Sequence, residues 1–567
     1  MHMCQKGFPT IIIAIIVGTV ILLGGAYVIV KRSGQPVAPE PPLTNQQSEV
    51  QPLFGTMVAF NINDAVGGNP TAGAPGLDAL GQKGWTQFRK DNSAYQNLLS
   101  NLEKLIQDRT KLVKATGFFL DRGSFGYFTW NVIEPQKGQF DWELTDIYVK
   151  GASNAGVKIS AVIQPFAGWD QKGTQTNKNA LDFAYYDYKA GPPKDIVEYE
   201  NFLTKTVERY KDKVAVWEIA NEPDSPDGGY QNNPEGYFDL VKISSETIKK
   251  IDPKAKVTNG GASGFANNNN SERNFWTKFF QLGGSQYIDY FNLHYNTERS
   301  QDAKLDPANF EKVLQIYNNL MEQNGGRKPL YLTEFGIYSG SPSSQPPGQS
   351  NQGPVQGQTN SPAAASPSGQ SPNPPSGGKC GDGICDDFEK TNPSACTQDC
   401  GGSTPSGNQE QPSGQPVQEQ VPNQNVQPNQ GQTLRNVSEN EQAALYFKDS
   451  ILAFANGVKV VFIDLIGSDN DTIGSSMAFN TDNKPRLFLT TLKTIVSKIG
   501  GFSKVEKIAN SQYKFTAGGK TVYALWSGTL PNEISGNVKV TDMKGQERFM
   551  DVTGIKLKAD QPVLIEL

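Results

Sequence analysis

Residues 214–224 read VAVWEIANEPD, and this stretch decides the fold. Val, Ile and Trp favour a buried β-strand. Pro223 has no backbone N–H to give to a sheet, so the strand stops before it and leaves Glu222 at the strand end. Residues 330–336, LYLTEFG, repeat the arrangement, with Glu334 at the end of a second apolar run. Two carboxylates at two strand ends are the groups needed to cleave a glycosidic bond.

Strand-like and helix-like segments alternate from residue 53 to residue 338. This alternation predicts an α/β fold built on a parallel sheet. We expect strands at residues 54–62, 117–120, 157–164, 214–221, 255–259, 287–294 and 329–334. We expect helices at residues 95–113, 142–155, 194–210, 236–251, 274–282 and 310–323. The helices at 95–113 and 194–210 carry apolar residues on one face, as a helix packed on a sheet does.

Residues 339–435 interrupt this pattern, because they are almost wholly Ser, Pro, Gly, Gln and Asn and cannot bury a core. Order resumes in residues 436–501, where Ser438 and Glu441 form a capping box for a helix that ends near residue 457. A strand at 458–466 and a helix at 485–499 follow. The fold class is therefore predicted to be a (β/α)8 TIM barrel, with a long disordered insertion after strand seven.

Residues 502–567 contain short alternating runs at 512–515, 521–526, 538–541, 555–557 and 563–567. Glycine turns separate several of them, so we expect a small C-terminal antiparallel β domain packed on the side of the barrel.

Residues 8–30 form an apolar stretch long enough to span a bilayer. No small-residue cleavage site is obvious, which favours an uncleaved transmembrane anchor over a removed signal peptide. Residues 31–52 are a Pro/Gln-rich spacer. We expect a membrane-anchored protein whose catalytic part lies outside the cytoplasm.

Four of the five cysteines lie close together within residues 380–400: Cys380, Cys385, Cys396 and Cys400. An isolated cluster in a polar tract is typical of disulfides in an oxidising compartment. Its spacing does not fit paired zinc ligands. The module resembles small extracellular repeats of the CGDGxC type. Asp382, Asp386 and Asp387 are candidate calcium ligands, and the alternative is a solvated acidic face.

The bulk composition excludes several function classes. The chain has 567 residues and a net charge of −5, with no clustered basic stretch, which argues against nucleic-acid binding. It has only two histidines, His2 and His294, which leaves too few for a three-histidine zinc site. Aromatic residues make up 10% of the chain, which suits a carbohydrate ligand. We expect a monomer that uses no cofactor.

Several motifs together resemble clan A of the glycoside hydrolases. These are WEIANEPD at 217–224, TEFG at 333–336, WNVIEP at 130–135 with FDW at 140–142, and NLHY at 292–295. The tail PVLIE at 562–566 resembles the β domain of the β-xylosidase and α-iduronidase family, here in a prokaryotic, membrane-anchored version with an inserted cysteine module. The resemblance covers residues 53–338 and 438–567. It implies a retaining hydrolase of a β-linked poly- or oligosaccharide, with Glu222 as acid/base and Glu334 as nucleophile.

The resemblance also implies substrate-binding roles for further residues. Asn221 would hydrogen-bond the sugar 2-hydroxyl, and a tyrosine at the end of strand six would touch the nucleophile. Further candidates follow from their places in the chain. His294 and Tyr295 end strand six, and Arg122 comes after strand two, where it could hold Glu334 ionised by direct pairing. Rings that could stack on a sugar follow strands two, three and four: Trp130, Trp169 and Tyr230. Each has a structural alternative: a turn for Asn221, a core position for His294 and the aromatic residues, and a surface position for Arg122.

One departure from the clan keeps other functions open. Many members place a Trp at the end of strand eight, whereas this chain has Phe462 in that region and no Trp. The alternatives are that Phe462 or another loop replaces it, or that the subsite is unusual. A non-catalytic glycan-binding or cell-surface scaffold protein and a transglycosylase are the rival functions.

Overall fold

The structure is a computed structural model. It describes residues 53–57, 59–60, 65, 92–123, 126–171, 192–225, 228–264, 269–297, 305–337, 437–465, 477–480 and 483–567, all within one compact unit of the chain. The predicted anchor and spacer, and the insertion with its cysteines and candidate calcium ligands, lie outside the described residues and stay predictions. Among the residues described, no helix is both long and apolar enough to cross a bilayer.

Eight parallel strands form one sheet in the order β5-β4-β3-β2-β1-β8-β7-β6. They are β1 (Phe54–Met57), β2 (Leu120–Arg122), β3 (Lys158–Ile163), β4 (Val214–Ile219), β5 (Lys256–Asn259), β6 (Phe291–Thr297), β7 (Leu330–Ile337) and β8 (Val458–Asp464). Parallel bridges from Thr258 to Tyr290 and from Ala262 to Leu293 join the β5 and β6 ends of the sheet. The predicted barrel is therefore confirmed.

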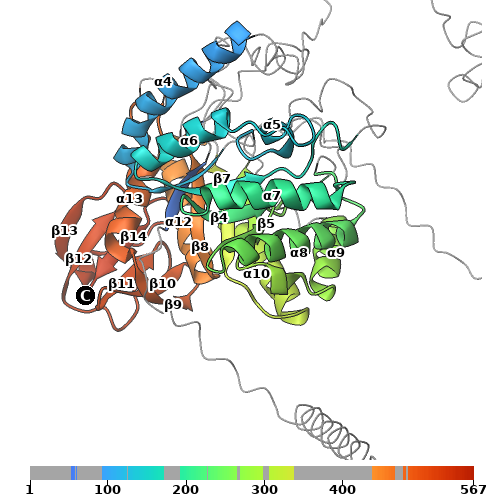
Figure 1. The fold of residues 1–567 in the computed structure, drawn as a ribbon. Helices are drawn as coiled ribbons and strands as arrows, with labels where there is room; N and C mark the ends of the chain where they lie inside the picture. Colours follow the sequence, from blue (N-terminus) through green and yellow to red (C-terminus); the bar gives the residue numbers. More distant parts are fainter. Residues whose placement is uncertain are drawn as a thin grey trace, which may run out of the picture. The chain divides into compact units, whose positions relative to one another are not determined.

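The helices that follow the strands surround this sheet (Figure 1). They are α4 (Asn92–Thr116), α5 (Trp130–Ile133), α6 (Glu143–Asn154), α7 (Ile196–Tyr210), α8 (Pro234–Ile251), α9 (Asn270–Gln281), α10 (Pro307–Gln323), α12 (Glu439–Ala455) and α13 (Leu487–Ile499). The capping box expected at the start of α12 is present, since the Ser438 hydroxyl accepts from the Glu441 N–H.

The strand after the long insertion completes the barrel. Val461 of β8 is paired with Phe54 of β1 on one side and with Leu332 of β7 on the other. A segment far along the chain thus fills the gap between the first and seventh strands, as its apolar pattern predicts. The barrel interior holds a small cluster of buried side chains: Leu120, Val216, Tyr290, Tyr331, Val460 and Phe462. Phe462 is fully buried there, so it does not replace the missing strand-eight Trp.

Three strands differ from their predicted positions. β1 ends at Met57 instead of reaching residue 62, and residues 59–60 form a turn. Gly117 has a φ of 75°, and β2 begins three residues after it at Leu120, so Arg122 lies within the strand rather than after it. Residues 284–287 form a 3-10 turn, η2 (Gly284–Tyr287), which delays the start of β6 to Phe291. As a result, Arg122 lies at the C-terminal end of β2 and Asn296 lies near the C-terminal end of β6.

The C-terminal domain is a six-stranded antiparallel sheet in the order β13-β12-β14-β11-β10-β9. Its strands are β9 (Phe502–Ala509), β10 (Gln512–Ala517), β11 (Lys520–Leu525), β12 (Asn537–Asp542), β13 (Glu547–Asp551) and β14 (Val563–Glu566). The predicted strand at 555–557 is wrong, because it follows a 3-10 turn, η5 (Val552–Gly554). The strands β9 and β13 were missed because most of their side chains face solvent.

The β domain packs on the last helix of the barrel. The Thr491 hydroxyl of α13 donates to the Met543 carbonyl at 2.8 Å, and Lys498 forms ion pairs with Glu547 and Glu566. The predicted docking of this domain on the side of the barrel is confirmed by these contacts.

Candidate active site

Arg122 is the centre of a buried polar network at the C-terminal ends of the strands. Its Nε and Nη2 donate to the two carboxylate oxygens of Glu218 at 2.9 and 2.8 Å. Its Nη1 donates to Glu334 Oε1 at 2.9 Å, and its Nη2 donates to Asn221 Oδ1 at 2.8 Å. A guanidinium suits this arrangement because its planar fork holds several acceptors in fixed directions. One side chain from β2 therefore sets the positions of residues from β4 and β7.

The backbone at the end of β4 is bent sharply. Ala220 and Glu222 both have positive φ, at 64° and 40°, which L-residues rarely adopt. Strained backbone of this kind is held in place by its surroundings, at a cost of about 1–3 kcal/mol per residue. Two glycines make room for it, since a Cβ at Gly228 would lie 1.8 Å from the Glu222 carbonyl oxygen and one at Gly260 would lie 2.5 Å from the Ala220 carbonyl.

The backbone is also irregular at the second carboxylate, Glu334, where the pairing of β6 with β7 shifts by one residue. Leu293 pairs with Leu332 and His294 pairs with Glu334, so Thr333 has no opposite residue. An extra residue of this kind redirects side chains that would otherwise alternate between the faces of the sheet. Thr333 and Glu334 consequently both contact His294.

The charges around Glu334 favour its ionised form. Burial alone would raise the pKa of Glu334, but His294 and Arg122, together with a hydrogen bond from Asn296 at 3.3 Å, lower the pKa below its ordinary value. Burial also opposes the charge on Arg122, yet the Glu218 and Glu334 carboxylates raise the pKa of the guanidinium. Glu334 is therefore a carboxylate at neutral pH, as a nucleophile must be.

His294 links the two carboxylates. Its Nδ1 lies 2.8 Å from Glu222 Oε1 and 3.6 Å from Glu334 Oε2, and its Nε2 lies 3.0 Å from the Thr333 hydroxyl. That hydroxyl gives its single hydrogen to Asn292 Oδ1 at 2.9 Å, so it accepts a hydrogen from Nε2 of the histidine. The ring nitrogen that faces Glu222 is then the one that gains or loses a proton.

The ring of His294 is close to the backbone of the neighbouring strand end. A Cβ added at Gly261 would lie 2.1 Å from His294 Nε2, so only glycine fits beneath the ring. Burial would lower the pKa of His294, but the Glu334 and Glu222 carboxylates outweigh it and raise the pKa. One atom each of Glu222, His294 and Glu334 all lie within 4.8 Å of one another.

The chain is similar to known glycoside hydrolases in the region that carries both carboxylates. Residues 166–351 match the family model "Glycosyl hydrolases family 39", and this range contains Glu222 and Glu334. This region of the chain is therefore similar to glycosyl hydrolases family 39.

One curated relative and two solved structures describe the wider likeness. Probable mannan endo-1,4-beta-mannosidase C of Aspergillus terreus is 33% identical over 214 residues, which are 35% of this chain and 50% of the relative. The chain thus spans about half the length of that relative. A family 39 glycoside hydrolase from Bacteroides cellulosilyticus WH2 is 14% identical with a TM-score of 0.48, covering 81% of this chain and 77% of that one. A GH39 β-xylosidase from Caulobacter crescentus is 12% identical with a TM-score of 0.49, covering 92% and 98%.

The position beside Glu334, where a tyrosine was expected, is held by an asparagine. Tyr295 is buried and packs on Phe310, with 4.7 Å between the ring centroids. The next residue, Asn296, contacts Glu334 instead. The expectation that Tyr295 touches the nucleophile is therefore corrected to Asn296, because alternate residues of β6 face the barrel interior.

Two of the three aromatic candidates are core residues. Trp130 is fully buried in α5, where its Nε1 donates to Glu134 at 2.7 Å, and Tyr230 is buried against Tyr237. Neither offers a free ring face for a sugar, so these two predictions are wrong. Trp169 is half-buried, and its Nε1 donates to the Glu134 carbonyl at 2.8 Å.

Three residues of the network were not singled out from the sequence: Glu218, Asn296 and Thr333. Glu218 carried a usable signal, because a carboxylate inside a buried strand must have a cationic partner. Thr333 and Asn296 carried none, since their positions follow from the irregular pairing of β6 with β7.

Proposed function

We propose that this protein hydrolyses a β-linked poly- or oligosaccharide with retention of configuration, with Glu222 as acid/base and Glu334 as nucleophile. The short distance between these residues carries the proposal, since their nearest oxygens lie within 4.8 Å. Retaining enzymes hold the two carboxyl groups about 5–5.5 Å apart, whereas inverting enzymes need roughly 6.5–9.5 Å to admit a water molecule.

In the first step, Glu334 attacks the anomeric carbon while Glu222 gives its proton to the glycosidic oxygen. The bond between the anomeric carbon and the leaving group breaks, and an ester between the sugar and Glu334 forms. The charges described above suit this step, because Arg122 and Asn296 hold the Glu334 carboxylate ionised and oriented.

In the second step, Glu222 is a carboxylate and takes a proton from water as the water oxygen attacks the same carbon. The ester bond breaks, and Glu334 leaves as a carboxylate. The proton gained by Glu222 restores the acid for the next cycle. His294 Nδ1 sits 2.8 Å from the Glu222 oxygen and shares this proton with it.

Asn221 supports the carbohydrate assignment. Its Oδ1 accepts from Arg122, and no residue that the structure describes accepts from its Nδ2. The amide is therefore fixed in orientation with its N–H donors available, which fits a sugar hydroxyl beside the scissile bond.

The stereochemistry of the product tests the proposal directly. Proton NMR of the first sugar released from an aryl β-glycoside is expected to show the β-anomer before mutarotation occurs, because two displacements restore the configuration. The same assay with β-xylosides and β-mannosides separates the sugars that the names of the related proteins contain. Release of the α-anomer first would contradict the double displacement.

Replacing His294 is expected to change the pH dependence of kcat/KM. Because the carboxylates raise the pKa of His294, the proton shared with Glu222 is retained at low pH and is lost as the pH rises through this raised pKa. The variant His294→Gln is expected to move the high-pH limb of kcat/KM to lower pH. Thr333→Val, which removes only the Nε2 partner, is expected to move it less. An unchanged limb in both variants would show that the proton is not shared.

We also propose that residues 8–30 anchor the chain in a membrane, with the barrel outside the cytoplasm. The apolar stretch and the cysteine cluster of residues 380–400 support this placement.

A further inference from the structure

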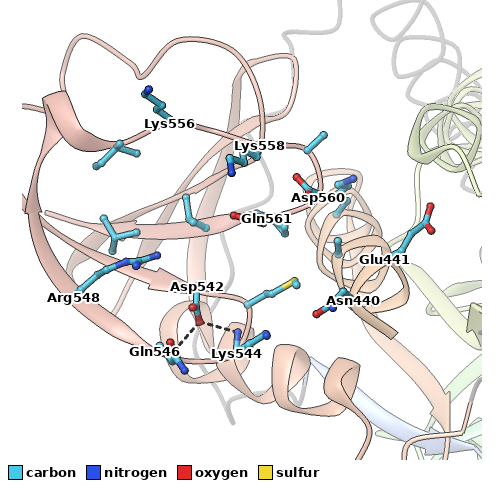
Figure 2. Close-up of a pocket in the computed structure, with 18 of the residues that line it drawn as sticks. Asn440, Glu441, Asp542, Lys544, Gln546, Arg548, Lys556, Lys558, Asp560 and Gln561 are labelled. Carbon is cyan, nitrogen blue, oxygen red and sulfur yellow. Dashed lines mark hydrogen bonds between the residues drawn. The ribbon is translucent and has the colours of Figure 1, made fainter. Parts of the chain in front are cut away.

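A large hollow lies between α12 and the β domain, on elements that do not carry the catalytic carboxylates (Figure 2). Its volume is about 1030 Å³. Ligand pockets usually measure about 300–1,000 Å³, so this hollow has room for several units of a polymer. Its lining comes from residues 438–448 of the α12 region and residues 540–563 of the β domain.

The hollow is ringed by basic side chains, and we call it the cationic hollow. Five cations line it: Lys448, Lys544, Arg548, Lys556 and Lys558. Figure 2 shows Arg548 reaching inward from the sheet and Lys558 reaching inward from the loop that faces it. This is an unusual concentration of positive charge for a chain with a net charge of −5.

Three acidic side chains also line the hollow, and one of them is held in a turn. The Asp542 carboxylate accepts from the backbone N–H groups of Lys544 and Gln546, both at 2.9 Å, and so closes the turn between β12 and β13. Burial lowers the pKa of Lys448, while Asp449, Glu441 and Asp560 act in the opposite direction and favour its charged form.

Four cations of the hollow form no ion pair with any residue that the structure describes: Lys544, Arg548, Lys556 and Lys558. The nearest acid in sequence to Arg548 is Glu547, which is bound by Lys498 and Lys539 instead. These four side chains therefore carry positive charge that no described acidic residue neutralises. A ligand with several negative charges would neutralise it.

The floor of the hollow limits the kind of ligand. It is formed by aliphatic side chains such as Val540, Met550 and Pro562, and none of the described residues that line it is aromatic. A neutral sugar would have no ring on which to stack. Recognition must therefore come from charge.

We propose that the cationic hollow is an accessory binding site for an anionic polysaccharide, one that carries carboxylate or sulfate groups. This inference rests on the proposed function, because it is the action on glycans that makes a glycan the expected anion. The site would hold the protein on an acidic polymer while the barrel acts on a glycosidic bond nearby.

Binding of defined polymers to the full-length protein in detergent tests the proposal. Polygalacturonate and dextran sulfate supply the carboxylate and the sulfate, and uncharged dextran is the reference. The triple variant Arg548→Gln/Lys556→Gln/Lys558→Gln is expected to weaken binding of the preferred polymer by about tenfold or more. Added salt is expected to weaken binding by the wild type, because these side chains are exposed.

A matched triple variant removes the same charge elsewhere. Lys254→Gln/Lys504→Gln/Lys520→Gln changes three exposed lysines outside the hollow and is expected to bind like the wild type. Equal loss in both triple variants, or no binding of either anionic polymer, would overturn the proposal. Turnover of a neutral aryl glycoside is expected to stay unchanged in the hollow variant. An absence of turnover in the wild type would instead refute the proposed function, independently of polymer binding.

Discussion

Replacing Glu334 with glutamine is expected to lower kcat by about 10⁴-fold or more. The amide cannot form the ester with the sugar, so the double displacement loses its first bond-forming step. The factor corresponds to about 5.5 kcal/mol of transition-state stabilisation. Steady-state turnover of an aryl β-glycoside, compared with the wild type, measures it.

The fold is expected to survive this change. Arg122 keeps its two hydrogen bonds to Glu218, so the buried guanidinium is still neutralised when Glu334 becomes an amide. Glu143→Gln is the matched control, because Glu143 lies exposed at the start of α6 and is expected to leave kcat unchanged. Thermal unfolding of both variants separates a catalytic loss from a loss of structure.

A smaller side chain at the same position gives a sharper test. In Glu334→Ala the space left by the carboxylate admits a small anion such as azide, which can attack the anomeric carbon once. Added azide is expected to restore turnover and to yield the glycosyl azide of inverted configuration. If azide restores nothing while Glu334→Gln retains most of its activity, Glu334 is not the nucleophile.

The positions of both carboxylates were predictable because local sequence fixes them. An apolar run followed by Pro223 ends β4 near Glu222, and the apolar run of β7 leads to Glu334. The eighth strand was also predictable across the long insertion, since the order of segments in a barrel requires a strand there.

The residues that support the carboxylates were less predictable because they depend on register. The pairing of Arg122 with Glu334 was expected from the sequence and is confirmed, although Arg122 lies within β2 rather than after it. Asn296 rather than Tyr295 faces Glu334 because side chains alternate along β6, which places Asn296 on the same face as His294. Trp130 points into the core because residues 130–133, between β2 and α6, form the short helix α5. A segment of four residues is too short for a periodic pattern to predict it.

Glu222→Gln is expected to show an effect that depends on the leaving group. The variant has no proton to give, so a substrate with a poor leaving group, such as a disaccharide, is expected to lose about 10²–10⁴-fold in kcat/KM. A dinitrophenyl glycoside leaves without protonation, so formation of the ester on Glu334 is expected to be little affected.

With that activated substrate, the second step becomes slow, because the amide cannot take a proton from water. A burst of dinitrophenol followed by slow turnover is therefore expected, and mass spectrometry of the quenched protein is expected to show the added sugar. His294 lies 2.8 Å from Glu222, so the alternative is that the histidine, and not Glu222, donates the proton to the leaving group. An equal loss on both substrates in Glu222→Gln, together with a leaving-group dependence in His294→Gln, would transfer the acid/base role from Glu222 to His294.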